Sequence, residues 1–280
     1  FISAGGTAGA LAGPLITQVL VRYLAPADLL LISAGLLIAA LLASLVLRNV
    51  HAGGGSKGPV NGHETEPAGG GIFDGAAKVF ASPYLGRIAL YVFLANVIGT
   101  FFYMEQSRLV GVTISDSAER VKFFAGRDLV VSVVTLAIQI FGTAQVMQRL
   151  GVTAALVALP LMATAGTLAL FYDPVLSVVA AVMAGERIAA FALSSPAIKV
   201  MYTLTAADEK YKVQNFIDTV VYRGGDALSG LVYAFVGTGM GFASGATALV
   251  AVPLVGLWIW TALGLGNAHA ARSADHQRSK

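Results

Sequence analysis

The sequence predicts an all-α polytopic membrane protein with about eight transmembrane helices. Of its 280 residues, 56% are hydrophobic and 12% are charged, whereas a soluble domain carries about 25% charged residues. Apolar runs of about 20 residues, the length that crosses a bilayer as a helix, recur between polar or glycine-rich segments. We expect spans at residues 1–20, 29–47, 85–104, from 127 onward, 152–171, 175–200, 210–236 and 246–265.

Small residues characterise the first span. Gly5, Gly9 and Gly13 recur at every fourth position and predict the close approach of another helix, and Pro14 predicts a kink. The second span consists almost wholly of Leu, Ile and Ala, so we expect it to face lipid. Residue 1 already belongs to an apolar helix, and we therefore expect further helices before it.

A change of composition divides the chain. Residues 49–82 are rich in Gly and Pro, which is typical of a flexible linker, and a short amphipathic surface helix is expected from residue 72 to its end. We expect the last two helices of an N-terminal half at 1–48, a six-helix C-terminal half at 83–266 and a polar tail at 267–280. Two six-helix halves with a site between them are typical of large secondary transporters.

The distribution of positive charge predicts the orientation. Most of the 18 Lys and Arg residues lie in or beside the 49–82 linker, the 149–151 turn, the 199–214 loop and the tail, which fall on one side of the predicted bundle. By the positive-inside rule that side is cytoplasmic. We therefore expect a cytoplasmic C-terminus.

Two spans carry a stripe of polar side chains at helical spacing. In the third span the stripe consists of Asn96, Thr100, Tyr103 and Ser107, with Glu105 beside it. In the fourth span, which begins near Arg127, it consists of Asp128, Ser132, Thr135, Gln139 and Thr143. Such stripes indicate either a wetted surface or hydrogen bonds between helices.

Adjacent opposite charges occur in the sixth span. Glu186 and Arg187 point about 100° apart on a helix, so each is expected to find a partner on another helix or in a ligand. Lys199 lies near the end of this span.

The seventh span, from about Lys210, is the most informative. On a helical wheel Asp218, Tyr222, Arg223 and Asp226 fall on one side. Ionisable groups at membrane depth are costly and mark substrate, ion or proton paths. The alternative is an Arg223–Asp226 pair that only locks neighbouring helices.

Enzymatic chemistry is not predicted. Cysteine is absent, and His51, His63, His269 and His276 all lie in the predicted linker and tail. The chain thus offers no thiolate metal site and no nucleophile with a nearby base inside a span. We expect no enzyme activity, no cofactor, no metal and no nucleic-acid partner.

Several segments resemble one transporter family. The Gly5–Pro14 segment, GGTAGALAGP, is similar to the fifth-helix signature of major facilitator transporters. The Glu209–Gly230 segment, EKYKVQNFIDTVVYRGGDALSG, resembles the EKYKAK-FID-VVYRGGD block of the bacterial and plastid nucleotide transporters, the ATP:ADP antiporter or NTP/NDP exchange family. Residues 120–139 and 195–212 resemble two further segments of that family. Gln214 and Ile198 replace groups that are charged in the family pattern.

This resemblance implies a major facilitator-like fold in a bacterial inner membrane and exchange of ATP for ADP by alternating access. The substrate would be a nucleotide or another small organic anion. Arginines and Lys199 would bind its phosphates, and the carboxylates would orient those cations. The candidate translocation residues are Glu105, Arg127, Asp128, Gln139, Glu186, Arg187, Lys199, Asp218, Tyr222, Arg223 and Asp226.

Two other hypotheses stay open. In a proton-coupled facilitator for another small molecule, Glu105, Asp128 or Glu186 would carry the proton. In a membrane scaffold of the same fold that transports nothing, the polar residues would serve assembly alone.

Overall fold

The computed structural model describes residues 2–53, 72–205, 207–235 and 251–278, and the regular secondary structure of these residues is helical without any strand. Six of the described helices are long and apolar enough to cross a membrane: 26–47, 83–113, 117–141, 151–172, 176–204 and 251–274. Helices satisfy their backbone hydrogen bonds internally, as a bilayer requires. The all-α prediction is confirmed, and the long apolar helices indicate a multi-pass membrane protein.

The chain forms two compact units. One comprises residues 1–69 and 114–126, and the other comprises residues 70–113 and 127–280. Besides the division in the predicted linker, the units are divided at residues 113/114 and 126/127, between the third and the fourth predicted spans.

The first unit contains α1 (Ile2–Leu20), which includes Pro14, and α2 (Pro26–Gly53). Asp28 stabilises the start of α2 because its carboxylate accepts a hydrogen bond from the Ala25 amide at 3.2 Å. Apolar side chains cover the exposed surface of α2, as expected of a lipid-facing helix. Residues 49–53 were predicted as linker, but they continue α2 as helix.

The close approach predicted at Gly9 and Gly13 is not formed within the described residues. Nothing lies within 4 Å of a Cβ added at either glycine. The described residues thus leave open space beside Gly9 and Gly13.

The second unit opens with the predicted short helix, α3 (Ile72–Ala81). It packs against α10 (Ala207–Phe216), and a Cβ at Gly75 would lie 2.6 Å from the Lys212 carbonyl oxygen. Lys78 and Glu209 form an ion pair across this contact at 3.4 Å.

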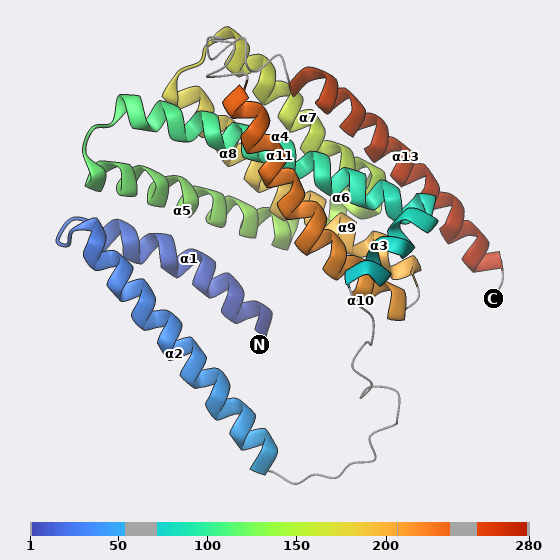
Figure 1. Ribbon diagram of the computed structural model, residues 1–280, viewed down its shortest axis with the longest axis horizontal. Coiled ribbons are helices and arrows are strands. Elements are labelled where there is room, and N and C mark those ends of the chain that lie inside the picture. The colour runs from blue at the N-terminus through green and yellow to red at the C-terminus, as the bar shows by residue number, and fades with distance from the viewer. Residues whose placement is uncertain (1, 54–71, 206, 236–250, 279–280) are drawn as a thin grey trace. The chain divides into compact units, whose positions relative to one another are not determined.

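The central helix of the second unit is α4 (Pro83–Thr113), which packs beside α8, α11 and α13 (Figure 1). It runs well beyond the predicted end at residue 104. Likewise α5 (Ser117–Phe141) begins ahead of the predicted start near Arg127, because Asp116 accepts a hydrogen bond from the Glu119 amide at 3.0 Å and so caps the helix.

Three helices follow α5. The first precedes the predicted fifth span, the second corresponds to that span, and the third begins the predicted sixth span. The short α6 (Thr143–Arg149) leads through Gly151, whose φ is +84°, into α7 (Gly151–Tyr172). Glycine adopts this left-handed conformation without a steric penalty. The next helix is α8 (Leu176–Ala189), which packs against α7.

The sixth and seventh predicted spans each contain a π-helical turn. In the sixth, η1 (Ala190–Ser194) joins α8 to α9 (Ser195–Met201), which ends in the short η2 (Tyr202–Leu204). In the seventh, η3 (Ile217–Val221) joins α10 to α11 (Tyr222–Ala234). Single π turns inside helices occur mostly at functional sites.

The last helix is α13 (Ala251–Arg278), which packs on α7 and α4. It continues through most of the predicted polar tail, 267–280, which is therefore helical rather than irregular. The predicted turn at 237–245 and the first residues of the eighth span lie outside the described residues.

We predict that Gly166→Ala destabilises the second unit. A Cβ there would lie 2.5 Å from Val182 Cγ1, and a β-branched side chain cannot rotate aside freely. The expected cost is about 1–3 kcal/mol of unfolding free energy, measured as a lower melting temperature in detergent.

Two matched substitutions serve as controls. At Gly185 the added Cβ would meet the end of the flexible Met162 side chain, and at Gly256 nothing lies within 4 Å. Both Ala variants should melt closer to the unsubstituted protein than Gly166→Ala does. Equal melting temperatures for Gly166→Ala and Gly256→Ala would contradict the close α7–α8 packing.

Candidate functional site

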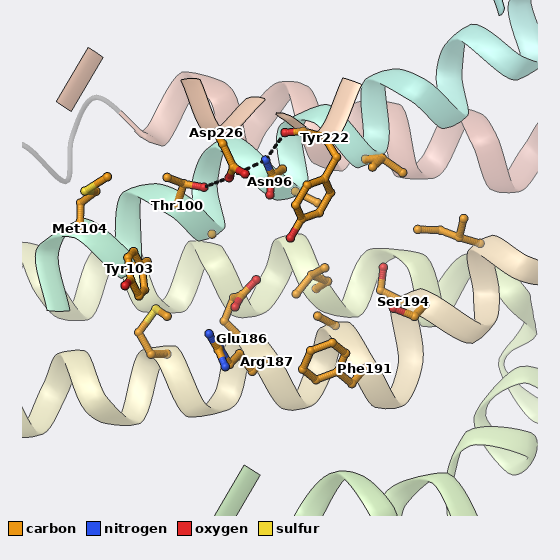
Figure 2. A pocket seen from close by; sticks show the side chains of 18 residues that line it. Asn96, Thr100, Tyr103, Met104, Glu186, Arg187, Phe191, Ser194, Tyr222 and Asp226 are labelled. Carbon is orange, nitrogen blue, oxygen red and sulfur yellow. Dashed lines mark hydrogen bonds between the residues drawn. The ribbon is translucent and has the colours of Figure 1, made fainter. Parts of the chain in front are cut away.

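A pocket of about 590 Å³ lies within the second unit, between α4, α7, α8, η1, α9 and the start of α11. Its described lining is mainly apolar but includes ionisable, amide and hydroxyl groups. Figure 2 shows Asn96, Thr100, Tyr222 and Asp226 on one side of it, and Glu186, Arg187, Phe191 and Ser194 on the other. Tyr103 and Met104 also line it. Every lining residue belongs to the same compact unit.

On the first wall, α4 and α11 are joined through Asp226. Asn96 Nδ2 donates a hydrogen bond to Asp226 Oδ1 at 2.9 Å and another to the Tyr222 carbonyl oxygen at 2.5 Å. Thr100 Oγ1 donates to the same Asp226 oxygen at 2.8 Å. A Cβ at Gly225 would lie 3.0 Å from Asn96 Nδ2, so the glycine permits this close approach. The third-span stripe therefore supplies the donors that satisfy a carboxylate on another helix.

On the second wall, Arg187 is held from α5. Its guanidinium lies 3.6 Å from Asp128 Oδ1, which also accepts hydrogen bonds from Arg127 at 2.6 and 3.0 Å. Arg127 in turn donates to Gln106 Oε1. The prediction that Arg187 finds a partner on another helix is confirmed. Asp128 thus links two arginines, only one of which lines the pocket.

Glu186 lies beside Arg187 but belongs to the pocket interior. Only 9% of its surface is exposed, and its carboxyl points toward the wall that carries Asn96 and Asp226 (Figure 2). Within the described residues its carboxyl is 3.4 Å from the position that a Cβ on Gly99 would occupy. Glycine at position 99 therefore leaves room for this acid.

Side chains of neighbouring helices hold the π turn η1 in place. Thr143 donates to the Ala192 carbonyl at 2.7 Å, and Gln139 donates to the Phe191 carbonyl at 3.1 Å. A π turn displaces carbonyl groups from their usual partners, and these two side chains satisfy them. For Gln139 and Thr143, the structure favours the interhelical alternative over a wetted surface.

The eleven predicted site residues divide into three groups. Those that line the pocket are Glu186, Arg187, Tyr222 and Asp226. Those that support it from outside are Arg127, Asp128 and Gln139. Those placed elsewhere are Glu105, Lys199, Asp218 and Arg223.

The four residues placed elsewhere have other surroundings. Glu105 pairs with Arg108 at 2.7 Å and accepts from the Tyr233 hydroxyl at 2.8 Å. Lys199 and Asp218 are exposed. The Arg223 side chain is 79% exposed and only 3.5 Å from Asp226 at its nearest. The expected common face of Asp218, Arg223 and Asp226 therefore delivers only Asp226 to the pocket.

A physical reason for this difference is the π turn at 217–221. A π turn has more residues per turn than the 3.6 of an α-helix, so it rotates Asp218 relative to everything after residue 221. Tyr222 and Asp226 both follow the turn and stay in register. Arg223 lies about 60° from Asp226 on the wheel, on the far side of the pocket wall.

Several residues that line the pocket were not among the predicted site residues. Asn96, Thr100 and Tyr103 formed a recognised stripe, and their helical spacing was the signal that could have added them to the site. Phe191 and Met183 are apolar, and nothing in their local sequence distinguishes them from lipid-facing residues.

In the described part of the chain, no three His, Asp or Glu side chains gather in a group that could hold a metal ion.

The structure defines a helical, multi-pass membrane protein with a pocket that carries ionisable groups between its helices. Comparison of the chain with protein-family models, with curated proteins and with solved structures finds no match.

We predict that Thr100→Val destabilises the protein while Thr100→Ser does not. Valine has the shape of threonine but cannot donate to Asp226, and losing a hydrogen bond to a charged group costs about 1.5–3 kcal/mol. Thermal unfolding in detergent should separate the two variants. Identical melting temperatures would show that the Thr100–Asp226 bond does not hold α4 to α11.

Proposed function

We propose that this protein is a secondary transporter that moves a small polar organic molecule by alternating access. The observation that carries the proposal is the pocket itself, which is lined by Glu186, Arg187 and Asp226. The helices of residues 83–113 and 176–204, which form much of its wall, are long and apolar enough to cross a membrane. Ionisable groups in an apolar bundle cost folding free energy. Such groups inside membrane proteins commonly mark the path of a transported solute or a proton. The pocket would be the wall of the binding site that this half contributes.

The finer form of the proposal is exchange of nucleotides, of the ATP/ADP type. It rests on the resemblance of the Glu209–Gly230 segment to nucleotide exchangers and on Arg187, an arginine presented to the pocket and oriented by Asp128. An oriented guanidinium binds carboxylate or phosphate oxygens in a defined geometry. The same resemblance supports a bacterial inner membrane as the location of the protein. The distribution of Lys and Arg supports a cytoplasmic C-terminus.

Counter-exchange in proteoliposomes tests this function. Vesicles containing the full-length protein are loaded with unlabelled ATP, ADP or another organic anion, and uptake of the labelled compound is followed. Uptake that requires the internal compound supports exchange. The complete absence of exchange and of uptake for nucleotides and other organic anions would contradict it.

We predict that Arg187→Gln lowers the initial rate of exchange by about 10–100-fold, the factor that corresponds to one charged hydrogen bond of about 1.5–3 kcal/mol. Arg149→Gln removes an exposed arginine at the end of α6, outside the pocket, and should leave the rate within about twofold. Both rates are measured at equal amounts of reconstituted protein. Equal losses in the two variants would show a general charge effect instead of a role in the pocket.

A second candidate function is proton-coupled transport, which the position of Glu186 favours. This acid is buried in the pocket wall, and among the described residues Arg187 is the charged neighbour beside it. A carboxyl so placed can gain and lose a proton as the pocket opens to each side.

We predict for this candidate that Glu186→Gln abolishes uptake driven by a pH gradient but preserves exchange between equal internal and external substrate. Glutamine keeps the shape and polarity of the side chain without its proton. Uptake is measured in proteoliposomes with and without an imposed gradient. A variant that still responds to the gradient like the unsubstituted protein excludes Glu186 as the proton carrier.

A further inference from the structure

We infer that the pocket receives the hydrogen-bond-donating part of the substrate, meaning amino, ammonium or hydroxyl groups, and holds at most one anionic group, at Arg187. This inference rests on the proposed function, because it assigns a substrate class to the same pocket. It follows from the two carboxylates of the lining and from the hydrogens that Asn96, Thr100 and Ser194 already donate within the wall.

Asn96 and Thr100 have no hydrogen left for a ligand. Both hydrogens of the Asn96 amide nitrogen are donated, one to Asp226 and one to the Tyr222 carbonyl. The single hydroxyl hydrogen of Thr100 goes to Asp226 at 2.8 Å. Asn96 therefore offers a ligand its amide oxygen, and Thr100 offers only oxygen lone pairs.

Ser194 reaches the same state through Tyr91. The Tyr91 hydroxyl has one hydrogen. Its oxygen lies 2.8 Å from the Leu156 carbonyl oxygen, which can only accept, so Tyr91 donates this hydrogen to Leu156. The Tyr91 and Ser194 hydroxyls are also 2.8 Å apart, so Ser194 must be the donor of this second bond. Ser194 is left with acceptor capacity toward the pocket that it lines.

The charges of the lining point in the same direction. Glu186 and Asp226 are both acceptors when ionised, and Arg187 is the one Lys or Arg among the lining residues that the structure describes. Asp128 already shares the Arg187 guanidinium. Among the described lining residues the carboxylates thus outnumber the guanidinium group, and the hydroxyls of Tyr103, Ser195 and Tyr222 can donate as well as accept.

Within the described residues, two further arginines lie near the pocket without lining it. The Arg127 side chain is 7% exposed and is bonded to Asp128 and Gln106. The Arg223 side chain is 79% exposed and pairs with Asp226 Oδ2 at 3.5 Å from outside the lining. A polyphosphate placed here would meet two carboxylates and one shared guanidinium, which is unfavourable. For a nucleotide, this half would therefore bind the amino group of the base and the ribose hydroxyls, with the phosphates bound elsewhere.

The natural absence of cysteine permits a direct test. Ser195→Cys and, as a second position, Ala190→Cys each place one thiol in the pocket lining. Thr203→Cys places one on the exposed η2 turn outside it. Each variant of the full-length protein reacts in detergent with cationic aminoethyl or anionic sulfonatoethyl methanethiosulfonate, and the Thr203→Cys rates correct for the intrinsic reactivity of the two reagents.

We expect the pocket thiols to favour the aminoethyl reagent by about tenfold or more, as clefts lined by one sign of charge concentrate the opposite sign. Adding Glu186→Gln with Asp226→Asn should bring the ratio close to one, and adding Arg187→Gln should raise it. A ratio of one or below at both pocket positions, with Thr203→Cys labelling normally, overturns the inference. The reaction needs no transport, so a protein that fails to exchange any solute but shows the expected ratio contradicts the proposed function alone.

Discussion

The structure depends on satisfying polar groups inside a bundle of apolar helices. An unpaired carboxylate or peptide carbonyl costs free energy in such a bundle even where the group is only half-buried. Asp226 meets this requirement through Asn96 and Thr100, and the same Asn96 satisfies the carbonyl of Tyr222 directly after the π turn. One interaction thus joins α4 to α11, stabilises an irregular turn and fixes a carboxylate at the pocket wall.

The two π turns give the pocket its shape. Phe191 and Ser194 reach the lining from η1, and Tyr222 reaches it from the end of η3. In each case a side chain from a neighbouring helix binds a carbonyl in or next to the turn, as Thr143 does for Ala192. The polar stripes of the third and fourth spans therefore serve two tasks, since one lines the pocket and the other supports the turn that lines it.

The sequence predicted the class of fold well, because hydropathy alone decides where membrane-length helices lie. It predicted the ends of these helices less well, since caps such as Asp116 and the extension of α4 beyond residue 104 depend on local hydrogen bonds. Spacing on a regular wheel placed Tyr222 and Asp226 correctly together but misplaced Asp218, because no signal in the sequence announced the π turn between them. The joining of Arg187 to Asp128 needed tertiary structure, since their helices approach only in the folded unit.

We propose that water fills the space between Asp226 and Glu186 within an otherwise apolar bundle. Spin labels attached to cysteines at Ala95, in the pocket lining, and at Leu168, on the exposed apolar surface of α7, measure this directly in reconstituted vesicles. We expect a water-soluble nickel chelate to relax the label at residue 95 more than dissolved oxygen does, and oxygen to relax the label at residue 168 more than the chelate does. Greater relaxation by oxygen at both positions would show that the pocket is not hydrated.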